Sequence, residues 1–342
     1  MTEHTTGNIN LTQNVFIYLM FPQNGVLHSH ILALEYFVSK GFSPIIVTNL
    51  KLNVVERENL KHLCHLIIER PNYGYDFGGY RDGVLSIEDK LPTLDRLVIM
   101  NDSCWFLVSE EIDWLAQVDA LNVDFAGTST DHGIPKRAPE DYENIEWSYS
   151  TSHDNFHYGS FALCFSNRLL SDPEFLRFWK EFKLTNKKLD VIMRGETGLT
   201  QWIKEHGYSH AATFDMNRLQ DEIQSLDQDE TLNLLQNLII AFEPNRLDLK
   251  TELLSQYDRS DEWTNRAKKF ILAAVAQQGL SYTLPGFSNT RLSYPFIKKS
   301  PVSLNDDASD RMFEITSKLQ TKAGKIIFEE IKEIRAARAN DL

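Results

Sequence analysis

The chain contains little cysteine, and its few cysteines are not spaced for cross-linking or metal binding. Among 342 residues there are three, Cys64, Cys104 and Cys164, an odd number at wide spacing. Disulfide frameworks use even numbers of cysteines, and zinc sites use closely spaced pairs. The sequence therefore argues against a small disulfide-stabilised fold and a cysteine zinc site, and it predicts three buried thiols.

Long hydrophobic runs and excess positive charge are also missing. No stretch approaches the roughly 18 uninterrupted apolar residues that a membrane-spanning helix needs. Residues 1–10 are polar and lack the apolar core of a signal peptide. We therefore expect a cytoplasmic protein without a transmembrane segment. The formal net charge of −13 argues against a nucleic-acid-binding protein, which would carry a basic face.

The N-terminal part of the chain alternates strand and helix patterns. Short apolar runs predict strands, and apolar residues three and four positions apart predict helices. Such alternation is typical of an α/β fold in which helices cover both faces of a mainly parallel sheet. The expected strands are 15–21, 44–48, 66–69 and 96–100, and the expected helices are 26–40, 54–63 and 77–89.

The pattern changes from residue 123 onward. Strands are expected at 123–128 and 158–165. They are separated by a polar segment, 129–155, whose length favours a substrate-covering loop. Asp172 and Pro173 begin an aromatic helix, because a capping residue followed by proline is a preferred helix start.

The last third of the chain is helical and charged. Apolar residues mark one face of a helix at 232–242 and another at 315–334. The C-terminal helix could bind a membrane surface or a partner helix, but its mixed charges make docking on the core the expectation. The sequence thus predicts a domain over 1–225 and a mainly helical C-terminal region over 226–342.

Two polar clusters follow predicted strands, where ligands of open α/β sheets bind. A carboxylate at Asp102, beside a carboxamide and a hydroxyl, suits a hydrated divalent cation that carries phosphates. Together the clusters predict a nucleotide-sugar site. The alternatives are an Asx-type turn or helix cap at Asp102 and a tight turn capped by Asp76. The first cluster contains Asn72, Gly74 and Asp76, and the second contains Asn101, Asp102 and Ser103.

Seven short motifs occur in a fixed order along the chain. They lie at 72–80, 101–103, 124–128, 157–165, 175–179, 195–200 and 295–299. In this order they resemble the rhamnan synthesis protein F family, and the resemblance covers roughly residues 14–300. One departure is Y-G-S-F after His157, where a Gln-Ser-Tyr-Phe-like run is expected. This difference bears on donor or acceptor preference rather than on the fold.

The resemblance implies a GT-A-like, Rossmann-type glycosyltransferase of bacterial polysaccharide assembly. Such an enzyme moves a sugar from a nucleoside diphosphate donor, here dTDP-rhamnose, to a hydroxyl of a surface polysaccharide or lipid-linked glycan. The acceptor would be met at the cytoplasmic face of the membrane, so peripheral membrane contact is expected. GT-A enzymes commonly hold Mg²⁺ or Mn²⁺ with an Asp-x-Asp motif. The corresponding triplet here has one carboxylate, which makes Asp102 the expected metal ligand.

Glu196 follows Gly195 and begins a predicted helix over 196–206. A helix N-terminus lowers the pKa of a carboxyl group and keeps it ionised. An ionised carboxylate can take the proton of an acceptor hydroxyl. Inverting GT-A enzymes place their base at a helix start in the corresponding region. The resemblance therefore implies an inverting reaction with Glu196 as base, and the alternative is that Glu196 only caps its helix.

Two further residues are candidates for the same site. His157 begins a predicted strand, where it would bind acceptor or donor, or serve as a structural hydrogen-bonding residue. Lys298 follows a Y-P-F-I segment. If that segment folds back on the sheet edge, Lys298 would neutralise the leaving diphosphate; otherwise it is an ordinary surface lysine. Trp105 is expected either to stack on a base or sugar or to belong to the core.

Two other functions remain open at this point. One is a phosphosugar transferase on a related architecture, which would release a nucleoside monophosphate. The other is a glycan-binding or assembly subunit without catalysis, which the single carboxylate of the 101–103 triplet motivates. Specificity would depend on pocket shape in the 129–155 segment, which the sequence does not reveal.

Overall fold

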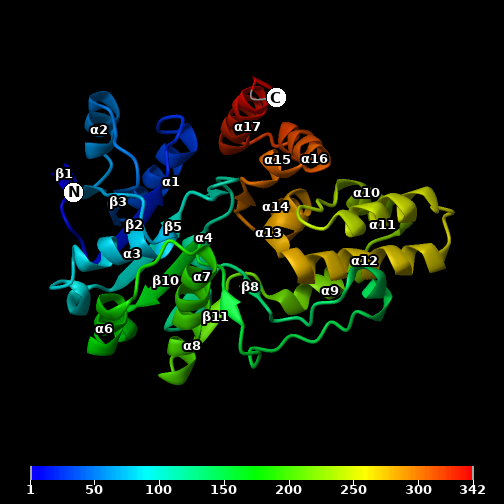
Figure 1. Cartoon of the computed structure of the whole chain (residues 1–342), viewed down its shortest axis with the longest axis horizontal. Coiled ribbons are helices and arrows are strands. Elements are labelled where there is room, and N and C mark those ends of the chain that lie inside the picture. The colour runs from blue at the N-terminus through cyan, green and yellow to red at the C-terminus, as the bar shows by residue number, and fades with distance from the viewer. Residues whose placement is uncertain (1, 341–342) are drawn as a thin grey trace. The chain divides into compact units, whose positions relative to one another are not determined.

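The computed structural model describes residues 2–340, which form two compact units. The first, the sheet unit, contains the described residues up to Ser103 together with Trp114–Thr128 and His157–Thr213. The second, the helical unit, contains Cys104–Asp113, Ser129–Phe156 and the described residues from Phe214 onward. Each unit is therefore built from several stretches that are separate in the sequence. Figure 1 labels many of the helices and strands of both units.

A mixed eight-stranded sheet forms the centre of the sheet unit, in the order β1-β4-β3-β2-β5-β10-β7-β11. β4, β3, β2 and β5 are parallel, whereas β10 runs antiparallel to both β5 and β7. The predicted α/β fold is confirmed. The strands of the unit are β1 (Glu3–Thr6), β2 (Asn14–Met20), β3 (Ser43–Thr48), β4 (Leu66–Glu69), β5 (Arg96–Asn101), β7 (Phe125–Gly127), β9 (His157–Tyr158), β10 (Ala162–Ser166) and β11 (His210–Ala212).

Some predicted elements of this unit need correction. The strand expected at 158–165 is wrong as one element, because a turn separates β9 from β10. β1 and β11 were not predicted: they are short, and β1 is mostly exposed, so neither carries an apolar run. The helix beginning after Asp172 is confirmed, and Asp172 accepts a hydrogen bond from the backbone N–H of Glu174.

Helices cover both faces of the sheet, as alternate side chains of β2 demonstrate. Phe16 stacks on Phe37 of α1, with 3.7 Å between ring centroids. The next residue, Ile17, lies against Gly83 of α3, where a Cβ atom would come within 2.6 Å of its side chain. Because successive side chains of a strand point to opposite faces, α1 and α3 lie on opposite faces. The helices of the unit are α1 (His28–Ser39), α2 (Val54–Lys61), α3 (Tyr75–Leu85), α4 (Trp114–Leu121), α5 (Asn167–Leu170), α6 (Pro173–Glu181), α7 (Lys188–Ile192) and α8 (Gly198–Glu205), with a 3₁₀ turn at Leu91–Thr93.

The strand order reverses direction at β2. The chain proceeds from β2 to β3 and then to β4 on one side, and it returns to place β5 on the other side of β2. In open α/β sheets this reversal leaves a crevice outside the carboxyl ends of the two strands, where ligands bind. The fold therefore directs attention to the residues that follow β2 and β5.

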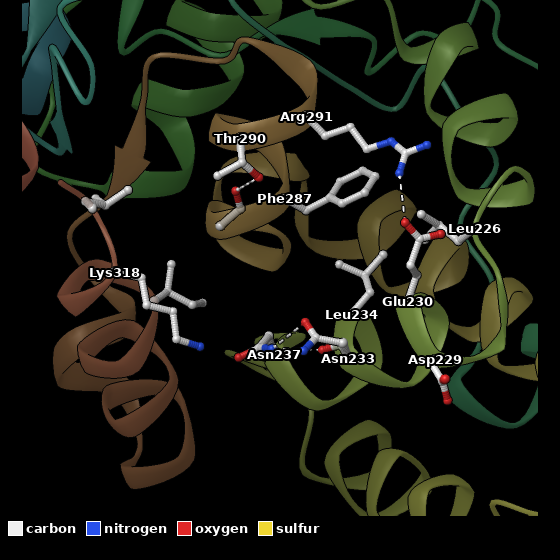
Figure 2. A pocket seen from close by; sticks show the side chains of 13 residues that line it. Leu226, Asp229, Glu230, Asn233, Leu234, Asn237, Phe287, Thr290, Arg291 and Lys318 are labelled. Carbon is white, nitrogen blue, oxygen red and sulfur yellow. Dashed lines mark hydrogen bonds and ion pairs between the residues drawn. The ribbon is translucent and has the colours of Figure 1, made fainter. Parts of the chain in front are cut away.

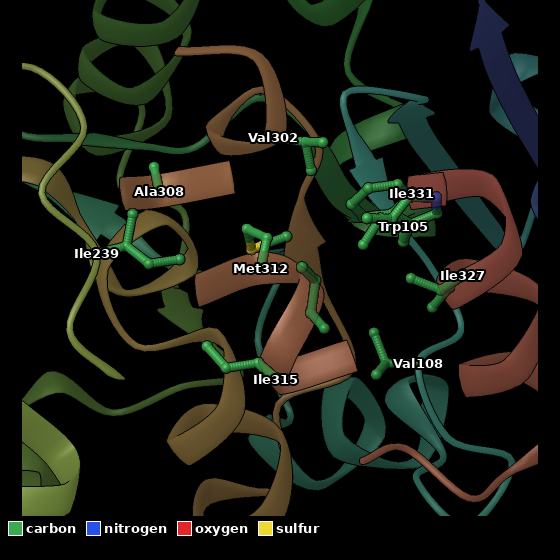
Figure 3. Packing of buried hydrophobic residues seen from close by; sticks show 10 residues of the cluster. Trp105, Val108, Ile239, Val302, Ala308, Met312, Ile315, Ile327 and Ile331 are labelled. Atoms are coloured by element: carbon green, nitrogen blue, oxygen red, sulfur yellow. The ribbon is translucent and has the colours of Figure 1, made fainter. Parts of the chain in front are cut away.

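The helical unit is built around a hydrophobic cluster that Figure 3 shows. Trp105, Val108, Met312, Ile327 and Ile331 are fully buried in it. Trp105 pairs with Ile297 across a two-stranded ribbon and donates a hydrogen bond from Nε1 to Glu330 Oε2 at 2.7 Å. Of the two predicted roles for Trp105, core packing is the one observed. The elements of the unit are β6 (Cys104–Trp105), β8 (Thr130–Asp131), a 3₁₀ segment (Pro139–Asn144), α9 (Met216–Gln224), α10 (Gln228–Asn237), α11 (Pro244–Ser255), α12 (Asp261–Gln278), α13 (Leu280–Thr283), α14 (Pro285–Leu292), β12 (Ile297–Lys298), α15 (Pro301–Leu304), α16 (Asp306–Ser317) and α17 (Lys322–Asn340).

The predicted helical C-terminal region is confirmed, but its two amphipathic helices are shorter than expected. The helix expected at 232–242 ends at Asn237, and Pro244 begins the next one. The helix expected at 315–334 is interrupted between Ser317 and Lys322. The polar 129–155 segment is anchored within the helical unit, where Trp147 donates a hydrogen bond to the carbonyl of Met216 at 2.8 Å.

The three cysteines are free and buried, as predicted. Burial raises the pKa of the Cys64 and Cys164 thiols to about 12, so these thiols are protonated and unreactive. Across residues 2–340, no helix combines the length and the apolar character that crossing a bilayer requires.

Candidate functional site

The two predicted polar clusters lie together at one edge of the sheet. Asn101, at the end of β5, donates a hydrogen bond from Nδ2 to Asp76 Oδ2 at 2.9 Å. Its Oδ1 accepts hydrogen bonds from the backbone N–H of Ser103 at 3.0 Å and from the Ser103 hydroxyl at 2.5 Å. The buried Asn101 therefore forms an Asx-type turn and also connects β5 with the start of α3.

Asp102 joins the ends of β2 and β5 at the reversal of strand order. Its Oδ2 accepts a hydrogen bond from the backbone N–H of Phe21 at 2.8 Å. The same oxygen lies 3.2 Å from Nε2 of His30, outside hydrogen-bond alignment. The Asp102 side chain retains 17% exposure, whereas His30 retains 1%. Asp102 is thus held at the ends of β2 and β5, and its side chain is partly exposed.

His30 is a component that the sequence analysis missed. Its Nδ1 accepts a hydrogen bond from the backbone N–H of Leu27 at 3.1 Å. In the neutral ring the proton is therefore on Nε2, the atom that faces Asp102. The only available signal was a histidine in the first turn of the helix that follows β2, and His28 lies in the same turn. Burial, which distinguishes the two histidines, comes from the tertiary structure.

The turn before α3 is not capped by Asp76, which was the alternative considered from the sequence. Gly74 precedes the helix with a φ of +83°, a conformation that favours glycine. Its N–H donates to Asn186 Oδ1 at 3.1 Å. Asp76 lies in the first helical turn and does not cap it, which corrects that alternative. Asn72 is exposed on the surface.

Glu196 does not begin a helix, so that prediction is wrong. α7, a π-helical turn over Met193–Thr197 and α8 form one continuous helical run. Glu196 therefore has no free helix N-terminus beside it. Instead, the Ser160 hydroxyl donates to Glu196 Oε1 at 2.5 Å, and His157 Nε2 lies 3.6 Å from Oε2. A single π-helical turn within a helix is frequent at functional sites.

Gly195 permits the close packing that positions this turn. A Cβ atom at Gly195 would lie 2.4 Å from Cδ2 of Phe77, a buried ring that stacks on both Trp179 and Phe182. We expect Gly195→Ala to lower the free energy of unfolding by about 1–3 kcal/mol, as overpacked cores do. Denaturant unfolding measures this change.

Gly198 provides the matched control. It is three residues further along the same run, and the nearest atom to a Cβ there is 3.4 Å away. Gly198→Ala should leave stability unchanged or raise it by up to about 1 kcal/mol, because alanine is the better helix former. Equal effects of the two substitutions would contradict a special packing role for Gly195.

Tyr80 lies at the centre of the site. Its buried hydroxyl donates a hydrogen bond to the carbonyl of Ser160 at 2.8 Å. Burial, together with the negative charges of Asp76, Glu196 and Asp102, raises the pKa of Tyr80 well above its ordinary value. The hydroxyl therefore remains a protonated donor. The shared effect on Tyr80 also indicates that the three carboxylates surround one region, although they come from three elements.

Tyr158, the residue after His157, forms a pair with a second histidine, His210. The hydroxyl of Tyr158 and Nδ1 of His210 lie 2.7 Å apart. Burial and the charge of Lys204 lower the pKa of His210 below 6.5. The unfolded chain then binds a proton before the folded one as the pH falls, so stability should decrease from about pH 6.5 downward.

His210→Gln should reduce this loss of stability, because it removes the group that titrates differently in the two states. The measurement is urea unfolding between about pH 5 and 8. His28→Gln serves as the control, since His28 is exposed and should leave the profile unchanged. An unaltered profile in His210→Gln would contradict the assignment.

Lys298 lies in the helical unit, on β12. Its partner on the neighbouring strand is Cys104, and its Nζ lies 5.5 Å from the centroid of the Tyr282 ring. The other predicted site residues belong to the sheet unit. A contact of Lys298 with the donor diphosphate stays a prediction.

The described residues supply few ligands for the predicted metal ion. Across 2–340, no three or more His, Cys, Asp or Glu side chains are arranged to hold one. Oδ2 of Asp102 is already engaged by Phe21. The protein alone does not supply a cation cage, so a Mg²⁺ or Mn²⁺ ion here would take most of its ligands from phosphates and water.

A separate hollow of about 600 Å³ lies in the helical unit and is shown in Figure 2. Phe287 and Leu234 contribute apolar surface, and Asn233, Asn237 and Lys318 contribute polar groups. None of the residues predicted for the nucleotide-sugar site lines this hollow. We therefore place the candidate site at the carboxyl ends of β2 and β5, where the carboxylates gather.

The fold and this site define an α/β protein with several carboxylates near its reversal of strand order. The chain belongs to the rhamnan synthesis protein F family, whose model matches residues 44–241, more than half of the chain. It is 31% identical over 210 residues to an uncharacterized protein, y4gN, of Sinorhizobium fredii. That match covers 61% of this chain and 51% of the relative, so the chain spans about half the relative's length.

Solved structures show only distant similarity. One is a protein of Desulfovibrio desulfuricans described as a nucleotide-diphospho-sugar transferase, with a TM-score of 0.31 and 11% identity over 73% of this chain and 100% of that chain. Another is S. aureus TarS in complex with UDP-GlcNAc, with a TM-score of 0.31 and 10% identity over 95% of this chain and 90% of that chain. Similarities at this level carry no functional argument.

Proposed function

We propose that the protein is a glycosyltransferase that moves a sugar from a nucleoside diphosphate donor to an acceptor hydroxyl. The observation that carries this proposal is the gathering of carboxylates near Tyr80. Asn101, next to Asp102, donates a hydrogen bond to Asp76, and Ser160 is hydrogen-bonded both to Tyr80 and to Glu196. Membership in a family named for rhamnan synthesis supports a sugar substrate. The crevice suits a diphosphate at Asp102 and a reacting hydroxyl near Glu196.

The proposed reaction is a single inverting displacement. The acceptor oxygen bonds to the anomeric carbon as the bond from that carbon to the diphosphate breaks, and the nucleoside diphosphate leaves. Glu196 takes the acceptor proton as base. The hydrogen bond from Ser160 holds the Glu196 carboxylate in place. Ser160 is therefore a positioning residue.

The proposal includes a divalent cation, Mg²⁺ or Mn²⁺, that enters with the donor diphosphate. Asp102 would be its protein carboxylate, with phosphate oxygens and water as the remaining ligands. When bound, such a cation neutralises charge on the leaving group. Donor-dependent stabilisation that persists in EDTA would remove the cation from the proposal.

dTDP-rhamnose is the proposed donor, and a hydroxyl of a bacterial surface polysaccharide or lipid-linked glycan is the proposed acceptor. The proposed location is the cytoplasm, at the inner face of the cytoplasmic membrane. Thermal unfolding with a panel of nucleoside diphosphates and nucleotide sugars, with and without Mg²⁺ or Mn²⁺, tests the donor. A ligand at about 100 times its Kd stabilises a protein by roughly 2.7 kcal/mol.

The products separate this reaction from its rivals. Sugar transfer releases a nucleoside diphosphate, whereas phosphosugar transfer releases a nucleoside monophosphate. Chromatography of the nucleotide after incubation with donor and acceptor distinguishes the two. The absence of stabilisation by any nucleotide, with metal present, would favour a glycan-binding subunit without catalysis.

A further inference from the structure

The sheet unit exposes an unusual group of apolar and aromatic side chains near Glu196. Tyr73 and Tyr75, which flank Gly74, are 45% and 41% exposed. Leu189 and Met193, four residues apart on one helical run, are 70% and 44% exposed. Large apolar side chains gathered on a surface mark interaction sites more often than isolated ones do.

These side chains belong to one surface because hydrogen bonds connect their segments. The Tyr73 hydroxyl donates to the carbonyl of Leu184 at 3.3 Å, and the Tyr75 hydroxyl donates to the carbonyl of Asn186 at 3.2 Å. α7 begins two residues later, at Lys188. The tyrosine rings are thus held against the segment that leads into Leu189 and Met193, while part of each ring stays in solvent.

The segment 183–194 of this surface carries four basic residues and one acidic residue, in contrast to the chain as a whole. Lys183, Lys187 and Lys188 are exposed, and among the described residues no ion pair involves any of them. Arg194 lies 3.9 Å from Asp190, near the limit for an ion pair. Four basic side chains therefore accompany Tyr73, Tyr75, Leu189 and Met193, in a chain whose net charge is −13. We call these eight residues the basic apolar patch.

We propose that the basic apolar patch binds the surface of an anionic lipid bilayer. Lysines attract anionic headgroups, and leucine and methionine side chains enter the boundary between headgroups and acyl chains. Tyrosine is enriched at this boundary because its ring is apolar and its hydroxyl is polar. Charge complementarity thus favours anionic lipid over a neutral or basic partner.

This binding would also bring the acceptor to the site. Met193 precedes Glu196 by three residues in the same π-helical turn. An acceptor carried by a lipid would therefore be presented close to the proposed base. That consequence rests on the proposed glycosyltransferase function, whereas binding to lipid does not.

Co-sedimentation of the full chain with lipid vesicles tests the proposal. We expect binding to vesicles of phosphatidylcholine with phosphatidylglycerol, weakening with salt, and little binding to phosphatidylcholine alone. Lys187→Gln with Lys188→Gln should weaken binding about 30-fold, since each basic residue near the surface contributes about five-fold. Leu189→Glu should weaken it at least as much, because it removes an inserted side chain and adds a repelled charge.

Matched substitutions in the helical unit provide the controls. Leu304→Glu changes a leucine with 41% exposure, and Lys269→Gln with Lys318→Gln removes two exposed lysines. These variants should bind vesicles as the wild type does. No binding of the wild type to anionic vesicles, or equal losses in patch and control variants, would overturn the proposal.

Measurements without lipid separate this proposal from the proposed function. Thermal unfolding should show that the patch variants are folded and still respond to the donor nucleotide. Loss of vesicle binding with donor response intact supports the patch. Vesicle binding by a protein that responds to no nucleotide would sustain the patch while the glycosyltransferase proposal fails.

Discussion

Glu196→Gln is expected to lower the rate of sugar transfer by about 10²–10⁴-fold, the usual contribution of a general base. Glutamine preserves the shape of the side chain and still accepts a hydrogen bond from Ser160, but it cannot take the acceptor proton. Donor binding should be unchanged, because the substitution removes a proton acceptor rather than a diphosphate contact. Release of nucleoside diphosphate that depends on acceptor measures the rate.

Ser160→Ala separates positioning from catalysis. It leaves the carboxylate in place but removes the hydrogen bond that orients it. We expect a smaller loss of rate than in Glu196→Gln, because the carboxylate that takes the proton is still present and only its orientation is less fixed. A Glu196→Gln variant with nearly full activity would show that another group accepts the proton.

Asp102→Asn is expected to weaken donor binding by at least about ten-fold in the presence of Mg²⁺ or Mn²⁺, equivalent to about 1.4 kcal/mol. Asparagine can still accept the hydrogen bond from the backbone N–H of Phe21, so the local fold should persist. It lacks the negative charge that would hold a cation on the diphosphate. The change in stabilisation by the donor nucleotide measures the effect.

The direction in which Asp102→Asn changes the affinity for the donor is informative. Without a cation between them, a carboxylate repels a diphosphate, so Asp102→Asn would tighten binding. Tighter binding would therefore contradict the role of Asp102 as the metal ligand. Asp95→Asn is the matched control, because Asp95 is exposed and precedes β5, at the opposite end of that strand from Asp102.

The sequence by itself was sufficient to predict the strands of the parallel part of the sheet. Strands β2, β3, β4 and β5 are continuous apolar runs because both faces of the sheet are covered, and such runs are visible locally. The polar clusters at 72–76 and 101–103 could be placed together for a related reason. The carboxyl ends of parallel strands share one edge of a sheet, so residues that follow such strands become neighbours.

Local sequence patterns were insufficient to predict contacts between segments that are distant in the sequence. His30 faces Asp102 from α1, and Ser160 reaches Glu196 from the turn between β9 and β10. Neither contact produces a periodic pattern in the sequence. Each depends on how the packing of the core places helices and strands. The surroundings of Glu196 illustrate the difference: its expected helix start was wrong, because a π-helical turn continues the preceding helix.

The sequence alone thus determined the α/β class, the family resemblance and the edge of the sheet where polar groups collect, because strand periodicity and strand-end residues are local properties. Only the tertiary structure decided which side chains surround Tyr80, that Trp105 is core, and that segments 104–113 and 129–156 belong to the helical unit. These features depend on long-range packing, in which burial and neighbours are set by residues far away in the chain.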